Sequence, residues 1–295
     1  CLKQEVLPME KREEAAKKVG ILGIFINFVL LILKLIVGLM SKSQAMIADS
    51  VNSAGDIFAS LMSFIGAKVS SKPKDEDHPF GHGKAEYIYS QLISISMVIA
   101  ALVMLNNSVE SIILNEKLEF SIWLVIVCLI TILTKFLLFI YARFKYKKWK
   151  SILIKASMED HRNDMVVTLG TLIGICFSLA GIYFVDGIIG AMISIWIGYV
   201  GCRLFFDSYK VLIDTTISKE EKEHIKQMSK NYPEILHVDS IATKPVGDKS
   251  IIILKISMDG KKTLEECHNI SGKLKYDIMN KFDYVYDVLI HINPH

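Results

Sequence analysis

The sequence lacks the cysteine pairs that build disulfide frameworks and zinc sites. Its five cysteines are isolated from one another, at Cys1, Cys128, Cys176, Cys202 and Cys267. Structural disulfides and cysteine-based zinc sites in small domains usually show pairs at short, regular spacings. The scattered positions therefore argue against both kinds of site.

An excess of charge of one sign is also lacking. The 295 residues include 34 Lys and Arg against 31 Asp and Glu, for a formal net charge of +3. Nucleic-acid-binding domains usually carry a clustered basic excess, so no nucleic-acid partner is expected. Hydrophobic residues are instead abundant: they form 52% of the chain, and the mean hydropathy is +0.38. Because the excess lies before about residue 210, the sequence predicts a membrane protein with a soluble C-terminal domain.

Six segments are long and apolar enough to cross a lipid bilayer. A membrane-spanning helix needs about 20 mostly apolar residues to cross roughly 30 Å of hydrocarbon. The predicted spans are residues 19–40, 45–67, 87–111, 120–142, 152–183 and 187–206. Four of them are nearly free of charge, whereas the second and the fifth carry acidic residues. The sequence thus predicts a cytoplasmic tail over residues 1–18 and an all-α, six-helix transmembrane domain over residues 19–210.

The distribution of Lys and Arg predicts the orientation in the membrane. The tail and the connections after the second and fourth spans are rich in basic residues, whereas the other side has only Lys42 and Lys117. Cytoplasmic connections of membrane proteins carry such an excess. We therefore expect a multi-pass protein of the plasma membrane with both termini in the cytoplasm.

Residues 211–295 have the pattern of a small α+β domain. Ser218 with Glu221, and Thr263 with Glu266, fit the capping box that begins a helix. Apolar residues then alternate with others, as in a strand with one buried face, at Ile252, Leu254, Ile256 and Met258. The predicted order is helix, strand, strand, helix, strand (αββαβ), which is similar to a ferredoxin-like domain.

The acidic residues of the second and fifth spans predict a cation site inside the membrane. Asn52 and Asp56 are four residues apart, as are Asp160 and Asp164, so each pair shares one helix face. A carboxylate in a bilayer costs about 2.5–3.5 kcal/mol and is usually retained for a function. Two such helices could close a four-oxygen cage around a divalent cation. The alternative is that these acids hydrogen-bond to neighbouring helices or lie in water near a span end.

His161 follows Asp160 directly and therefore points about 100° away from the face that carries the acids. We interpret it as a cavity or interface residue rather than a ligand. A second cluster, formed by Asp75, His78 and His82, lies in the connection after the second span. Imidazole and carboxylate at this spacing can bind one divalent ion. A solvated charged turn explains the same residues equally well.

Three segments together resemble the cation diffusion facilitator family. They are residues 48–61, residues 75–86 with the run His-Pro-Phe-Gly-His-Gly-Lys, and residues 159–164. The resemblance covers nearly the whole chain and implies a homodimer in the lipid bilayer that exports a divalent metal from the cytoplasm, in exchange for protons and by alternating access. It implies a transporter rather than an enzyme, and no organic cofactor.

By position, the resemblance also implies the roles of particular residues. The transport site would be formed by Asn52, Asp56, Asp160 and Asp164. The connection site would be formed by Asp75, His78 and His82. Lys84 would pair with Asp214 and interlock the two subunits of the membrane dimer.

The expected metal is Mn²⁺. Zinc transporters of this family usually place a histidine among the four transport positions, whereas Asn52 and Asp160 stand there in this chain. An all-oxygen donor set suits hard cations such as Mn²⁺, and imidazole favours Zn²⁺. The sequence therefore resembles the manganese branch of the family, with Zn²⁺, Fe²⁺, Co²⁺ and Cd²⁺ as the alternative substrates.

The resemblance also implies a metal site in the C-terminal domain, at His237, His268 and His291. Lys255 and Asn293 stand where zinc-binding relatives have a further histidine and an acid. We expect at most a weakened site. Two functions of other classes stay open from the residues alone: a membrane-embedded metal sensor without transport, and a membrane-embedded hydrolase that uses the paired carboxylates.

Overall fold

The computed structural model describes residues 9–41, 44–114, 122–179, 182, 184–215 and 217–295, with a few side chains left out within these ranges. The described chain forms two compact parts. The helical part comes from the segments Leu7–Lys72 and Ala85–Tyr209. The C-terminal part comes from Lys210–His295 together with the connection Pro73–Lys84. The two parts are treated separately below.

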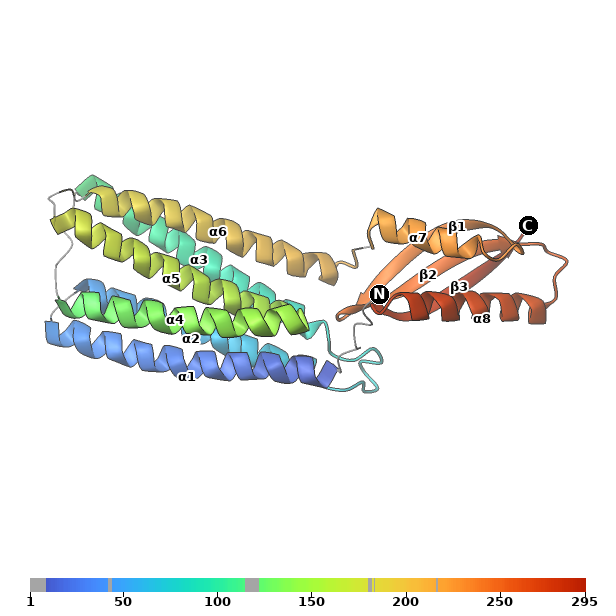
Figure 1. The fold of residues 1–295 in the computed structure, drawn as a ribbon, viewed down its shortest axis with the longest axis horizontal. Coiled ribbons are helices and arrows are strands. Elements are labelled where there is room, and N and C mark those ends of the chain that lie inside the picture. The colour runs from blue at the N-terminus through green and yellow to red at the C-terminus, as the bar shows by residue number, and fades with distance from the viewer. Residues whose placement is uncertain (1–8, 42–43, 115–121, 180–181, 183, 216) are drawn as a thin grey trace. The chain divides into compact units, whose positions relative to one another are not determined.

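Six long helices form the helical part and run alongside one another (Figure 1). They are α1 (Met9–Ser41), α2 (Gln44–Ser70), α3 (Ala85–Leu114), α4 (Ile122–Trp149), α5 (Ile152–Leu179) and α6 (Phe184–Leu212). Helix α1 packs mainly on α2, and α4 packs mainly on α5. Helix α1 already begins at Met9, so the second half of the predicted tail continues the first helix.

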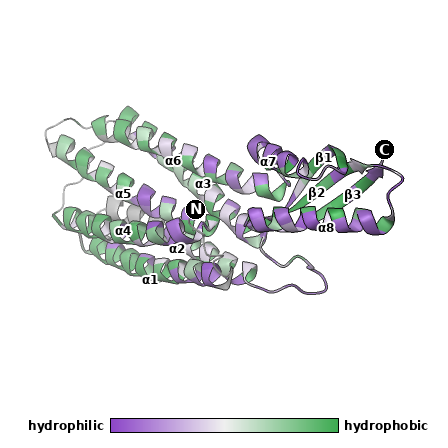
Figure 2. Ribbon diagram, turned by 45° about the vertical axis from the view of Figure 1, so that its right-hand side comes forward, coloured by the Kyte–Doolittle hydropathy of each residue, from purple (hydrophilic) through white to green (hydrophobic). Residues whose placement is uncertain are grey.

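Four of these helices contain stretches that are long and apolar enough to cross a membrane. Within the described residues the stretches are Lys11–Val37, Ala85–Ile113, Ile122–Trp149 and Gly187–Leu212. Figure 2 shows these helices as mainly hydrophobic. Large apolar side chains on their surface, such as Phe25 and Phe144, are 66% and 70% exposed. A contiguous apolar surface of this kind marks a contact with lipid or protein. Helices α2 and α5 carry more polar residues.

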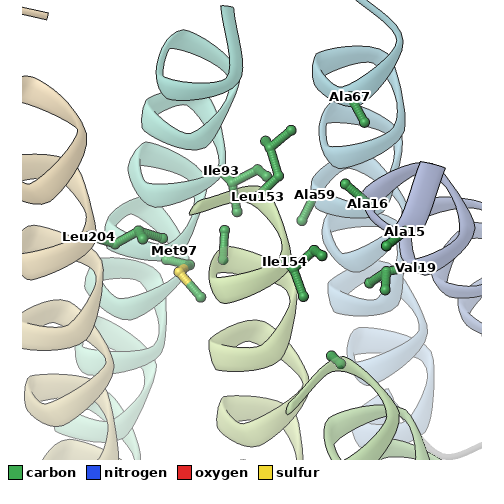
Figure 3. Packing of buried hydrophobic residues seen from close by; sticks show 12 residues of the cluster. Ala15, Ala16, Val19, Ala59, Ala67, Ile93, Met97, Leu153, Ile154 and Leu204 are labelled. Atoms are coloured by element: carbon green, nitrogen blue, oxygen red, sulfur yellow. The ribbon is translucent and has the colours of Figure 1, made fainter. Parts of the chain in front are cut away.

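Small side chains let the helices approach closely at one end of the bundle. Ala15 and Ala16 of α1 lie near Ala59 and Ala67 of α2, and larger residues such as Leu153 fill the adjacent space (Figure 3). Helix α6 approaches α3 through glycine: a Cβ atom at Gly187 would lie 2.5 Å from Ile112 Cγ1. Such small-residue contacts are typical of helix packing in membranes, where the lipid is as apolar as the side chains.

A buried polar network joins the ends of four helices. Arg12 Nη2 of α1 lies 2.9 Å from Glu86 Oε2 of α3, and Arg12 Nε donates to the carbonyl oxygen of Trp149 at 3.1 Å. Glu86 also accepts hydrogen bonds from Ser151 Oγ and from the backbone N–H of Leu153, at the turn between α4 and α5. Since Glu86 is only 4% exposed, this network compensates a charge that would otherwise be costly to bury.

The C-terminal part has the predicted αββαβ order. It consists of α7 (Lys219–Ser229), β1 (Ile235–Val246), β2 (Lys249–Met258), α8 (Leu264–Lys281) and β3 (Val285–Pro294). The sheet has the order β1-β2-β3; β1 and β2 are antiparallel, and β2 and β3 are parallel. The fold class predicted from the sequence, a helical membrane domain followed by a small α+β domain, is confirmed.

Local sequence explains the elements of this domain. Both predicted capping boxes are present: at Ser218, the backbone N–H donates to Glu221 Oε2 at 2.8 Å while the hydroxyl accepts from the N–H of Glu221. The alternating residues of β2 are buried, with Ile252 and Leu254 both 0% exposed. They pack against α7 and α8, for example against Leu274. The domain therefore has a hydrophobic core of its own.

Candidate metal centre

Helices α2 and α5, which pack against each other, bring three predicted ligands into one buried region. Asp56 of α2 is 8% exposed and Asp160 of α5 is 9% exposed. Asp164 lies one helical turn after Asp160, and its side chain is 14% exposed. Asp56 and Asp164 are joined through a common partner, described next. Asn52 belongs to α2, one turn before Asp56, but its side chain lies outside the described residues.

Lys135 of α4 is the common partner. Its Nζ donates to Asp56 Oδ2 at 2.8 Å and also to Asp164 Oδ2, and the side chain is 1% exposed. A buried ammonium between two carboxylates from different helices compensates charges that each helix alone would leave unpaired. The predicted span over residues 120–142 was counted among those nearly free of charge, and no role was assigned to Lys135. The signal was nevertheless present, because a lone lysine in the middle of such a span generally marks a functional site.

His161 lies closer to the acids than its position on the helix predicted. Its side chain is buried, and one imidazole nitrogen lies within 4.8 Å of carboxylate oxygens of both Asp160 and Asp164. This position is compatible with the interpretation of His161 as a cavity residue, and whether it is a ligand stays untested. Among the described residues, His161 Nδ1 has no hydrogen-bond partner. The centre therefore has an imidazole within reach in addition to its oxygen ligands.

Helix α1 supplies polar support behind α2. Asn27 is fully buried, and its Nδ2 donates to the backbone oxygen of Asp56 at 3.2 Å and to Ser60 Oγ at 3.1 Å. Two helical turns further along α1, Lys34 Nζ donates to Ser53 Oγ at 3.1 Å. These bonds tie α1 to the segment of α2 that carries the acid. They were not predicted, because contacts between helices do not follow from the spacing within one helix.

The connection Pro73–Lys84 gathers its three predicted ligands. His78 Nδ1 lies 3.0 Å from Asp75 Oδ1, and His82 Nε2 lies 3.5 Å from Asp75 Oδ2. The two imidazole rings have centroids 4.3 Å apart. Partial burial alone would raise the pKa of Asp75, but the hydrogen bonds from the backbone and ring of His78 outweigh it and hold that pKa below its ordinary value. One carboxylate and two imidazoles thus converge on the surface.

The same connection packs on the C-terminal domain. Lys84 Nζ lies 2.7 Å from Asp214 Oδ1, just beyond the end of α6. Asp214 has a left-handed backbone (φ 57°), and a carboxylate near a helix C-terminus is electrostatically unfavourable, so the lysine compensates it. Phe80 meets Tyr286 of β3 edge to face, with ring centroids 6.4 Å apart. The structure thus brings Lys84 and Asp214 together within one chain.

The three histidines predicted for the C-terminal domain do not form one cluster in the described chain. His237 Nε2 lies 2.7 Å from Asp239 Oδ1, whereas His291 Nε2 lies 3.0 Å from Asn293 Oδ1. His268 is on α8 and forms no group of three ligands within the part of the chain that the structure describes. Lys255 of β2 lies opposite His291 of β3 in the register of the parallel strands, which places a positive charge beside that imidazole.

Buried acids between helices of an apolar bundle, followed by a small α+β domain, are typical of a membrane transporter for cations. Comparison with known proteins agrees with this class. Residues 20–213 match the cation efflux transmembrane domain, and residues 217–295 match the cytoplasmic domain of cation efflux proteins. The chain belongs to the cation diffusion facilitator family. It is a cation efflux transporter rather than an enzyme, and its C-terminal domain is cytoplasmic.

Several characterised or named relatives are similar over most of the chain. The manganese efflux system protein MneP of Bacillus subtilis (strain 168) is 29% identical over 97% of this chain and 98% of its own. The magnetosome protein MamM of Magnetospirillum gryphiswaldense is 28% identical over 90% of this chain and 84% of its own. The cation-efflux pump FieF of Cronobacter sakazakii is 26% identical over 90% of this chain and 88% of its own.

Proposed function

We propose that this transporter exports Mn²⁺ from the cytoplasm, in exchange for protons, through the centre between α2 and α5. The observation that carries the proposal is the convergence of Asp56, Asp160 and Asp164 in one buried region. By its position in the sequence, Asn52 would add an amide oxygen, and such an all-oxygen donor set suits Mn²⁺ better than Zn²⁺. The similarity to a manganese efflux protein supports the same metal.

The same carboxylates account for the exchange with protons. A carboxylate binds metal only when it is deprotonated, so protons and metal compete for the site. When the site is open to the cytoplasm, deprotonated acids take the ion. When it is open to the outside, protons bind to carboxylates of the site, the ion leaves, and the bound protons are carried back to the cytoplasm. The energy of the proton gradient thereby drives metal out of the cell by alternating access.

The proposed arrangement places all six long helices in the plasma membrane, α2 and α5 included. Asp56, Asp160 and Asp164 face protein rather than lipid, which lets a helix with charged residues cross the bilayer. Residues 1–18 and 211–295 then lie in the cytoplasm, and residues 19–210 form the membrane domain. The protein works as a homodimer, and the pair of Lys84 with Asp214 is the interlock that ties the dimer together.

Two further sites accompany the transport site in this proposal. Asp75, His78 and His82 bind a divalent ion at the surface of the connection. His237, His268 and His291 form at most a weak site, because Lys255 repels a cation beside His291. A charge at about 4 Å is worth roughly 4 kcal/mol at an effective dielectric constant of 20.

A second candidate is export of Zn²⁺, with Fe²⁺, Co²⁺ and Cd²⁺ as related substrates. One observation favours it: His161 offers an imidazole nitrogen within 4.8 Å of Asp160 and Asp164 oxygens. Imidazole is the ligand that shifts preference from Mn²⁺ towards Zn²⁺. If His161 enters the coordination sphere, the site is no longer all oxygen.

Flux into sealed vesicles tests the proposal. Purified protein is reconstituted into liposomes, a pH gradient is imposed, and uptake of Mn²⁺, Zn²⁺, Fe²⁺, Co²⁺ and Cd²⁺ is followed in parallel. We expect Mn²⁺ uptake that depends on the gradient and makes the lumen more alkaline, because protons leave the vesicle as the metal enters. Faster Zn²⁺ than Mn²⁺ uptake would favour the second candidate. Metal binding without any flux would contradict the proton-coupled transport proposed for this site.

A further inference from the structure

Metal coordination does not explain why a lysine, Lys135, lies in the metal centre. Its ammonium is 1% exposed and is paired with Asp56 and Asp164, which come from two different helices. A lysine cannot be a metal ligand while it is protonated, because the ammonium has three donors and no acceptor. Its location among proposed ligands therefore requires a role other than coordination.

The ammonium and a metal ion would compete for the same two carboxylates. Lys135 Nζ contacts Oδ2 of Asp56 at 2.8 Å and Oδ2 of Asp164. A divalent ion shared by the two carboxylates would have to contact this pair of residues too, and it would be repelled by an ammonium that remained between them. Metal and ammonium therefore exclude each other from the centre. The lysine stem has four rotatable carbon–carbon segments, so its head can withdraw without movement of α4.

We propose that Lys135 is a tethered cation that occupies the transport site in the metal-free state and is displaced when the metal binds. This inference rests on the proposed function of the site. The ammonium stays charged in both states and only changes its position. It compensates the carboxylates that stay deprotonated while the empty transporter returns, and it lowers the affinity for metal so that the ion can leave.

The size of the effect follows from competition within one molecule. When only a fraction of the protein has its ligands free, the apparent dissociation constant rises by the inverse of that fraction. If Lys135 occupies the site in about 90–99% of metal-free molecules, its removal should tighten metal binding by about ten- to hundredfold. Turnover should fall at the same time, because metal release and the return of the empty transporter both depend on the Lys135 ammonium as a counter-ion.

The test compares Lys135→Met with Lys135→Arg in the full-length protein in lipid nanodiscs. Methionine keeps the length of the side chain without its charge, and arginine keeps the charge. All variants carry His78→Ala and His82→Ala so that the surface site does not contribute. Bound Mn²⁺ is measured by electron paramagnetic resonance, and Mn²⁺ flux is measured in liposomes. Lys155→Met is the matched control, because Lys155 pairs with Asp207 at 2.7 Å elsewhere in the same bundle.

We expect about ten- to hundredfold tighter Mn²⁺ binding and a lower maximal flux for Lys135→Met, with binding close to wild type for Lys135→Arg and Lys155→Met. A gain of affinity cannot result from damage to the fold. Equal or weaker binding in Lys135→Met would overturn the inference. If Asp164→Asn leaves the wild-type isotherm unchanged, the proposed transport site itself is wrong, which is a different result.

Thermal unfolding provides a second measurement should Lys135→Met be difficult to purify without metal. Removal of the tethered cation leaves acids uncompensated only in the metal-free state. The variant should therefore unfold at a lower temperature than wild type in chelator, and Mn²⁺ should raise its midpoint by more than it raises that of wild type. A Mn²⁺-induced increase equal to or smaller than that of wild type would contradict the displacement of Lys135 by metal.

Discussion

The two parts of this protein present candidate metal ligands in opposite ways. In the helical part, the side chains of Asp56 and Lys135 are 11% and 1% exposed. In the C-terminal part, those of Asp75 and His78 are 51% and 55% exposed. A buried charge must be compensated by another charge, whereas an exposed one is compensated by water. The acids of the buried centre always need a positive partner, so this centre is suited to replacing one cation by another. The exposed site is suited to reversible metal binding that leaves the fold unchanged.

Ion pairs outside the proposed metal sites also differ in their exposure between the two parts. Arg12 and Glu86 are 11% and 5% exposed at their side chains, whereas Lys84 and Asp214 are 35% and 43% exposed. Breaking a buried pair leaves an uncompensated charge and costs about 3–5 kcal/mol, whereas an exposed pair contributes about 0–1 kcal/mol. Single polar residues thus contribute more to the stability of the helical part than to that of the C-terminal part.

The strongest expected difference between the two sites is in transport. Asp56→Asn or Asp164→Asn should reduce Mn²⁺ flux by more than about 100-fold, since even loss of a residue that only supports a metal ligand costs 10- to 100-fold. His78→Ala with His82→Ala should leave flux measurable. Liposome uptake is the measurement, and Asp207→Asn is the control carboxylate of the same bundle. Wild-type flux in both aspartate variants would show that the ion takes another path.

The next largest effect concerns the polar network at Glu86. Glu86→Ala should lower the free energy of unfolding by about 3–5 kcal/mol, because it leaves Arg12 buried without its carboxylate. Lys84→Ala should cost no more than about 1 kcal/mol. Unfolding in detergent, followed by tryptophan fluorescence, compares the variants. Similar losses in both would mean that burial does not set the strength of these pairs.

A smaller change is expected in metal preference. Asp160→His adds an imidazole beside His161, so the ratio of Zn²⁺ to Mn²⁺ uptake should rise by about tenfold, or roughly 1.4 kcal/mol. Competition uptake with both metals measures the ratio. Asp207→His serves as the control for an added histidine outside the centre. An unchanged ratio in Asp160→His would indicate that the ligands in the membrane do not set the selectivity.

The smallest effect is the pH dependence of the C-terminal sheet. Hydrogen bonds from Asn293 and Ser257, together with the nearby His237, hold the pKa of Asp239 below its ordinary value of 3.8. A lowered pKa contributes stability that is present above pH 3.8 and is lost as the pH falls through the lower, folded-state pKa. The protection of β1 and β3 amides against hydrogen exchange, relative to the intrinsic rate at each pH, should therefore decrease below that pH in wild type, which we describe as an acceleration of exchange. In Asp239→Asn this acceleration should be reduced; an identical pH profile would exclude Asp239 as its cause.

Local patterns in the sequence predicted more of the C-terminal domain than of the metal centre. Capping boxes and alternating apolar residues act within one element, so Ser218, Thr263 and the buried residues of β2 were assigned correctly. Helical spacing grouped the acids of α2 and α5, and the structure places Asp56, Asp160 and Asp164 in one buried region, but their role as ligands stays a prediction. The pairing of Lys135 with Asp56 and Asp164, and that of Arg12 with Glu86, was missed. These contacts join distant elements, and only the packing of the helices determines them.

The most direct test of the account is the location of Mn²⁺ in the protein itself. Crystals or lipid-embedded samples loaded with Mn²⁺ at neutral pH would reveal the ion by anomalous scattering or by its density. The account predicts an ion coordinated by Asp56, Asp160 and Asp164 between α2 and α5, with the ammonium of Lys135 displaced from Asp56 and Asp164. Mn²⁺ bound at Asp75, His78 and His82 alone, with Lys135 still paired to both acids at saturating metal, would contradict it.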